Sequence, residues 1–205
     1  GWTYDELLIV MGLFFALNGY RQMILEPNLS RMSEHVRLGT LDYILTKPAN
    51  SQFLVSLRRI GVYNWGDPLL GLGLVVVALA RMSRMPGPVE LGLFIVLLVV
   101  AMVLLYSLSL ILQTTTIWLV NVERLDTVVM GLLETGRFPV NFYRGWLRVF
   151  LTAVIPVAFM TTFPARALLG RLEPWLAAVA VILAAVSFVV ASLFWRFALR
   201  HYSGA

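Results

Sequence analysis

Few residues of this 205-residue chain are of the types that carry nucleophilic, acid–base or metal chemistry. The sequence has no cysteine, which excludes disulfides, thiolate zinc sites and cysteine nucleophiles. Its two histidines, His35 and His201, are far apart in the chain and lie in basic stretches. Because a metal site needs more ligands than these supply, we expect both histidines to be solvated surface residues and predict no metal site.

Motifs for nucleotide binding and hydrolysis are also absent from the sequence. Lys47, the single lysine, is followed by Pro48, so the glycine-rich loop that ends in Lys-Ser or Lys-Thr and cradles ATP phosphates does not occur. Neither the Gly-x-Ser-x-Gly pattern of serine hydrolases nor the His-Glu-x-x-His pattern of zinc proteases is present. We therefore expect no catalytic residue, no bound cofactor and no enzymatic activity in this chain itself.

Three carboxylates border long apolar runs, where a charge often marks the path of an ion or substrate through a membrane. Asp67 precedes Pro68 near the start of one run, and Glu90 and Glu173 lie at the ends of two others. A carboxylate at a helix start can cap the first turn, so we expect Asp67 to cap a helix, with a role in transport as the alternative. The lack of a carboxylate or histidine deep inside a run disfavours a proton-coupled carrier.

The composition around these residues is that of a membrane protein. Apolar residues form 60% of the chain and charged residues 13%, against about 25% charged in a typical soluble domain. A helix that crosses a bilayer needs roughly 20 apolar residues. We count five candidate spans, at Leu7–Tyr20, Ile60–Ala80, Leu91–Val122, Val149–Phe163 and Pro174–Trp195. The predicted fold is an all-α polytopic membrane protein with one transmembrane domain over residues 1–205.

Individual residues suggest how these spans pack. Pro156 is expected to kink the fourth span. Small residues at Gly12 and Ala16 allow close contact between helices. Tryptophans near the ends of spans, Trp195 among them, are expected at the membrane interfaces.

The cations predict the orientation of the chain. The net charge of +5 comes from 16 lysines and arginines against 11 acids. Five crossings leave four cations on one side, Arg81, Arg84, Arg166 and Arg171. Since cytoplasmic loops are rich in these residues, we expect the side with the other twelve to be cytoplasmic, with the C-terminus inside and Gly1 outside. These twelve are Arg21, Arg31, Arg37, Lys47, Arg58, Arg59, Arg124, Arg137, Arg144, Arg148, Arg196 and Arg200.

The longest predicted cytoplasmic connection, residues 26–59, has an organised pattern. Gly39 interrupts it, Thr40 can cap a short second helix, and Pro48 ends that helix. The pattern predicts a surface helix, a break and a second helix, which together offer an apolar ridge to the groove of a partner. The ridge residues recur at helical spacing: Leu29, Met32, Val36, Leu41, Ile44 and Leu45.

The run from His35 to Pro48 resembles a motif of the permease subunits of type-2 ABC exporters. That motif begins with an aliphatic residue, a basic residue and the pattern x-Gly-x-Leu-Asp. It continues with x-x-Leu and ends in a basic residue followed by proline. The matching residues are Arg37, Gly39, Leu41, Asp42, Leu45, Lys47 and Pro48. The stretches 146–165 and 194–203 are similar to the fifth span and the C-terminal tail of that family.

The resemblance implies a six-span permease of the prokaryotic plasma (inner) membrane. The chain would then lack its first span, which agrees with a sequence that begins with Gly1 rather than Met. Two permeases, identical or related, would form the pathway, and separate ATP-binding subunits would bind the ATP and dock on residues 26–59 as the coupling segment. Membrane lipid is a further expected partner. Nucleic acid is not, because the cations are dispersed between apolar runs rather than gathered on one face.

Other interpretations stay open from the sequence alone. Residues 26–59 also suit a helix that lies on lipid headgroups. An ion-coupled secondary transporter or channel subunit is the main alternative to an ABC permease, and a membrane-embedded enzyme or assembly factor is another. The motif favours the permease, and the few charges within the spans favour an amphiphilic, lipid-like or drug-like substrate over small ions.

Overall fold

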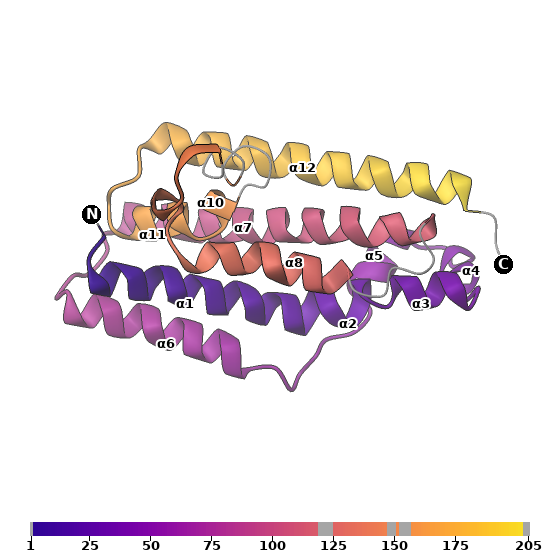
Figure 1. Ribbon diagram of the computed structural model, residues 1–205, viewed down its shortest axis with the longest axis horizontal. Helices are drawn as coiled ribbons and strands as arrows, with labels where there is room; N and C mark the ends of the chain where they lie inside the picture. The colour runs from indigo at the N-terminus through magenta and orange to yellow at the C-terminus, as the bar shows by residue number, and fades with distance from the viewer. Residues whose placement is uncertain (1, 119–124, 147–150, 152–156, 203–205) are drawn as a thin grey trace.

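The computed structural model describes residues 2–118, 125–146, 151 and 157–202, and no strand occurs in these ranges. Four helices lie lengthwise in an elongated bundle: α1 (Tyr4–Tyr20), α6 (Gly66–Arg81), α7 (Pro88–Thr114) and α12 (Pro174–His201) (Figure 1). α7 and α12 run in the same direction as α1, and α6 runs back along α1. We call the end at which α1 begins the first end.

The opposite end, which we call the second end, carries three short helices. They are α3 (Met32–Arg37), α4 (Leu41–Leu45) and α5 (Ser51–Ser56). Together with α2 (Glu26–Leu29) they make up most of the Glu26–Arg59 segment, which the sequence singled out as the organised connection.

Three helical stretches in the described part of the chain are long and apolar enough to cross a membrane: Tyr4–Arg37, Pro88–Ile117 and Pro174–His201. They match the first, third and fifth predicted spans. α6 stands in place of the second but has only 16 residues. At about 1.5 Å per residue it is about 24 Å long, short of a hydrocarbon core of about 30 Å. The structure thus supports three of the five predicted spans.

Much of the predicted fourth span lies outside the described residues, Pro156 included, as do Arg124 and Arg148. Its described end consists of two short helices rather than one continuous span. These are α10 (Val157–Met160) and α11 (Thr162–Leu168), which pack on α7 toward the first end.

The return from the second end is made by α8 (Leu125–Glu134), which lies between α1 and α7 (Figure 1). Its ten residues are too few and too charged to have been recognised as a crossing. Val129 and Leu133 are each 1% exposed, so its apolar side is packed against the neighbouring helices. The path of the chain along α8 depends on burial against these neighbouring helices, and the sequence pattern does not show which helices those are.

The four cations assigned to one side do gather at the first end. Arg81 and Arg84 each pair with a carboxylate there at 2.9 Å. Arg171 Nη1 lies 2.6 Å from Oε1 of Glu6, a side chain that is 1% exposed. The basic residues of this end are therefore largely neutralised by nearby acids.

Arg137 was predicted to lie on the side with twelve cations, away from Arg81 and the first end, and this prediction is wrong. Its guanidinium carbon lies 4.7 Å from the centre of the Phe14 ring, which belongs to the middle of α1. A few residues later, Asn141 lines a cavity together with Arg171 at the first end. The cause is the return along α8, which carries the chain away from the second end before residue 137.

Glycines let α1 and α6 pack backbone to backbone. A Cβ added at Gly12 would lie 2.7 Å from the carbonyl oxygen of Gly71, and one added at Gly71 would lie 2.7 Å from the backbone nitrogen of Ala16. Farther along α1, a Cβ at Gly19 would overlap with the ring of Pro68. The close contact predicted from Gly12 and Ala16 is confirmed, since distances under 3 Å leave no room for a side chain.

Candidate functional site

The motif residues lie on a helix–turn–helix at the second end. α3 ends at Arg37, after which the Leu38 N–H donates to Glu34 O at 2.9 Å and the Gly39 N–H donates to Val36 O at 3.2 Å. Gly39 has a φ of +66°, a left-handed conformation that strains any residue with a Cβ. The predicted helix, break and second helix are confirmed, and this backbone conformation favours glycine at the break.

A side-chain hydrogen bond closes the same turn. His35 Nδ1 lies 2.7 Å from Thr40 Oγ1, and both residues are half-buried. Thr40 occupies the N-cap position of α4, but its side chain makes no capping hydrogen bond. The predictions of a capping Thr40 and a solvated His35 are therefore wrong, because the two side chains satisfy each other across the turn at Gly39. His201 is exposed, as predicted.

The apolar ridge of these helices faces into the protein. Leu41 is 0% exposed, and Met32, Val36 and Ile44 are also buried. They belong to one core cluster with Leu104 of α7. The expectation that this ridge is open to a partner is wrong, because packing on the end of the bundle already removes it from water. What the ridge does is tie the Glu26–Arg59 segment to the long helices.

A smaller set of side chains faces outward. Leu38 is 59% exposed and Tyr43 is 75% exposed, and the charged residues around them, Arg37, Asp42 and Lys47, are exposed too. The sequence missed Leu38 and Tyr43 because helical spacing locates a ridge without showing which face meets the core. The other motif residues are one exposed proline and two half-buried residues, Pro48, Gly39 and Leu45.

Asp42 faces the C-terminal end of α12. Burial raises the pKa of the Tyr202 phenol, and the negative charge of Asp42 raises that pKa further. Tyr202 directly follows His201, the last residue of α12. The fold therefore brings the motif aspartate and the C-terminal tail, two stretches far apart in the sequence, to the same place.

A third helix, α5, follows α3 and α4 in the Glu26–Arg59 segment and was not predicted. The Asn50 side chain caps it by accepting from the N–H groups of Gln52 at 3.0 Å and Phe53 at 3.4 Å. Beyond α5, the Arg59 N–H donates to Asn28 Oδ1 at 2.8 Å, and Asn28 Nδ2 donates to Arg59 O at 2.7 Å. This reciprocal pair of bonds fastens the end of the Glu26–Arg59 segment to its start. Asn50 after a proline-ended helix was the sequence signal for α5.

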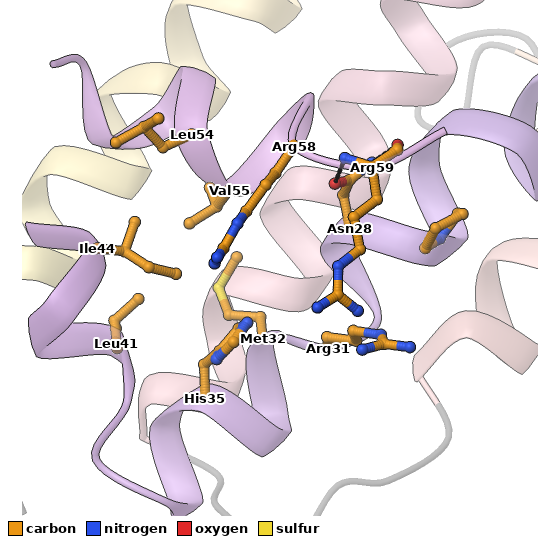
Figure 2. Close-up of a pocket in the computed structure, with 11 residues that line it drawn as sticks. Asn28, Arg31, Met32, His35, Leu41, Ile44, Leu54, Val55, Arg58 and Arg59 are labelled. Carbon is orange, nitrogen blue, oxygen red and sulfur yellow. Dashed lines mark hydrogen bonds between the residues drawn. The ribbon is translucent and has the colours of Figure 1, made fainter. Parts of the chain in front are cut away.

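Figure 2 shows a small cavity between these helices that is lined by basic groups. Arg31, His35, Arg58 and Arg59 line it, and no carboxylate of the described residues does. Its volume of about 20 Å³ is far below the several hundred Å³ of a typical ligand site. The cavity thus cannot hold a nucleotide, but its rim favours a negatively charged group on a partner's surface.

The family model of ABC-2 family transporter proteins matches residues 1–205. The chain belongs to this family. Neither a curated protein nor a solved structure matches it. It is therefore an ABC permease, a multi-pass membrane subunit of a transporter, as its motif indicated. In the described part of this permease, no group of three or more His, Cys, Asp or Glu side chains is placed to hold a metal ion.

Asp67 joins two helices of the permease. Its Oδ2 accepts from Asn18 Nδ2 at 2.5 Å and from Gln22 Nε2 at 2.7 Å. The N-cap position of α6 is Trp65, and no side chain makes a capping hydrogen bond there. The predicted capping by Asp67 is not found, because amide donors from the end of α1 and the turn after it take up the carboxylate. A favourable contact with the dipole at the start of α6 is kept.

The first helix of the permease changes its winding where the Glu26–Arg59 segment attaches. Residues 21–25 form a π-helical turn, a feature often found where helices serve a function. Pro27 has no N–H to donate, so the Met23 carbonyl accepts from the Gly61 N–H instead, at 2.7 Å. Arg21 Nη1 lies 3.3 Å from Glu26 Oε2 across this joint. The joint therefore connects α1, α2 and the loop before α6.

Proposed function

We propose that the second end of this permease is the docking surface for a separate ATP-binding subunit, and that ATP hydrolysis there drives export of an amphiphilic, lipid-like or drug-like substrate. The observation that carries the proposal is the exposure of Leu38 and Tyr43 on the α3–α4 helix pair, whose other large apolar side chains are buried or half-buried. Large apolar side chains of this kind form the centre of protein contacts. Exposed Arg37 and Asp42 beside them are suited to fix the register of a partner.

The unit is connected so that a displacement at its outer face reaches the long helices. Leu41 packs in the core beside α7, and Asp42 faces the end of α12. Asn28 holds the end of the segment against α2. Packed elements move as rigid bodies rather than deforming continuously, so a shift of α3 and α4 would carry α7 and α12 with it.

The same proposal includes orientation and assembly. The second end faces the cytoplasm of a prokaryotic cell, and a second permease, identical or related, completes the pathway. Charge supports this orientation, because Arg81, Arg84 and Arg171 at the first end pair with acids, while the second end has a basic cavity that no carboxylate of the described residues lines. An excess of positive charge is typical of the cytoplasmic side.

A charge placed at Tyr43 tests the docking surface. In vesicles that contain the permease and its ATP-binding subunit, Tyr43→Asp should abolish ATP-driven transport and weaken co-purification of the two subunits, because the new carboxylate would be desolvated in the contact. Tyr63→Asp is the matched control, since Tyr63 is 96% exposed and lies outside the Glu26–Arg59 segment. Both variants should keep the wild-type unfolding temperature.

Two outcomes would contradict the proposal. Equal transport by the two tyrosine variants would mean that Tyr43 makes no contact with the partner. Transport by the permease alone under an ion gradient would support an ion-coupled carrier in place of an ATP-driven one.

A further inference from the structure

A groove of about 700 Å³ lies between α5, α7 and α12, toward the second end. Its volume falls within the range of about 300–1,000 Å³ that is usual for sites of small organic ligands. It is separate from the basic cavity of the Glu26–Arg59 segment, with which it shares no lining residue. Its two ends differ in chemistry, and that difference indicates what it binds.

The end of the groove nearest the second end is polar and held in place by hydrogen bonds. Gln52, a buried residue of α5, donates from Nε2 to the Tyr106 hydroxyl at 3.1 Å and to Ser192 Oγ at 3.0 Å. Ser56 Oγ lies 2.9 Å from the same Tyr106 hydroxyl. These bonds tie α5 to both α7 and α12, so the polar lining is a fixed part of the fold.

Trp195 strengthens the same junction and corrects a prediction. It is 1% exposed, and its Nε1 donates to Ser51 Oγ at 3.2 Å. It therefore does not lie in an interfacial belt, as the sequence suggested, because α5 covers it. The floor of the polar end is thus a packed contact between α5 and α12.

The other end of the groove is apolar. Val99 precedes Tyr106 by seven residues on α7, and Val189 precedes Arg196 by seven residues on α12. Since the two helices run in the same direction and rise about 1.5 Å per residue, both walls extend about 10 Å from the polar end toward the middle of the bundle. Val99 and Val189 are 54% and 53% exposed, so this wall is uncovered in the chain.

The charge that lines the groove indicates which kind of polar ligand group the groove suits. Among the described residues, Arg196 is the one charged side chain that lines the groove, and no carboxylate of those residues does. Within the described part of the chain, no acidic side chain forms an ion pair with Arg196. An arginine at the mouth of a groove, beside amide and hydroxyl groups, matches a phosphate group.

We propose that this groove binds an anionic phospholipid-like amphiphile, with its phosphate at Arg196 and Asn50 and its chain between Val99 and Val189. The proposal deepens the proposed function, because it assigns the substrate class of the exporter. It does not depend on docking of the ATP-binding subunit, since binding to the permease alone can be measured. A second copy of this chain could also cover an uncovered wall, but it does not explain a fixed polar end with an arginine in the same lining.

The test uses the purified full chain, freed of lipid in a neutral detergent and titrated with phosphatidylglycerol or with phosphatidylcholine of the same acyl chains. Binding is followed by native mass spectrometry. Phosphatidylglycerol should bind about tenfold more tightly, because the choline cation of phosphatidylcholine offsets the attraction between its phosphate and Arg196. Arg196→Gln should remove about that factor of preference between the two lipids. Arg200→Gln is the matched control, because Arg200 is equally an exposed arginine of α12 but does not line the groove.

A second variant tests the apolar wall. Met102 lines the groove on α7, so Met102→Trp should weaken the binding of both lipids by filling the groove. Equal binding of the two lipids, or equal effects of Arg196→Gln and Arg200→Gln, would overturn the proposal. Because the chain has no cysteine, Val189→Cys provides a clean further test, and a disulfide-linked dimer of this variant in membranes would show that a second copy fills the groove instead. Loss of transport with lipid binding intact would bear on the proposed function and not on this site.

Discussion

Replacing Leu41 by alanine should loosen the Glu26–Arg59 segment while its outer surface stays the same. Leu41 is 0% exposed and belongs to the core cluster shared with α7. Truncating a buried leucine to alanine destabilises a protein by about 2–5 kcal/mol, through lost transfer free energy and the cavity left behind. Because α4 has only five residues and can shift to fill part of that cavity, we expect about 2–3 kcal/mol here.

Hydrogen exchange of the purified permease, followed by mass spectrometry, measures this effect locally. A loss of about 2–3 kcal/mol should speed exchange of the α3 and α4 amides by about 30- to 160-fold, while the central amides of α7 stay protected. Tyr43→Ala is the control within the same helix, because Tyr43 is 75% exposed. A change at an exposed site alters stability by about 0.5 kcal/mol or less, so its exchange should differ by about twofold at most.

The two variants separate packing from docking. Leu41→Ala should reduce transport by loosening the segment, and Tyr43→Ala should reduce transport with wild-type exchange. If Leu41→Ala leaves the exchange of α3 and α4 unchanged, the buried ridge does not hold this segment to the bundle, and the rigid connection on which the coupling proposal depends is refuted.

Three further substitutions and one control variant test other parts of the fold. Gly39→Ala should destabilise the α3–α4 turn by about 1–2 kcal/mol, seen as faster exchange there, because Gly39 has a φ of +66°. Gly71→Val should lower the unfolding temperature by forcing α1 and α6 apart, whereas Gly73→Ala, where a Cβ meets nothing within 4 Å, should leave it unchanged or raise it. Asp67→Asn should also lower the unfolding temperature, since two amides lose a charged acceptor. If the pH dependence of transport is unchanged in this variant, Asp67 has a structural role. An altered pH dependence would favour a role of Asp67 in the path of an ion.

Local sequence signals predicted part of the site. The turn at Gly39 follows from glycine's access to left-handed backbone, and that property is local to the residue. The motif around Asp42 indicated the family, and the family model confirms it over residues 1–205. By contrast, the bond between His35 and Thr40 was missed, because each residue also has an ordinary role, as a surface histidine or a helix cap, that the sequence alone makes more common.

The sequence by itself determined that this is a helical membrane protein, where its longest apolar helices lie, and where its organised connection breaks. These properties follow from composition, from the length of apolar runs and from the backbone preferences of single residues. Only the tertiary structure decided that Leu41 faces the core while Tyr43 faces out, that the chain returns along α8, and that Trp195 is covered by α5. The physical reason is that burial depends on which neighbours a face meets, and those neighbours come from distant parts of the chain.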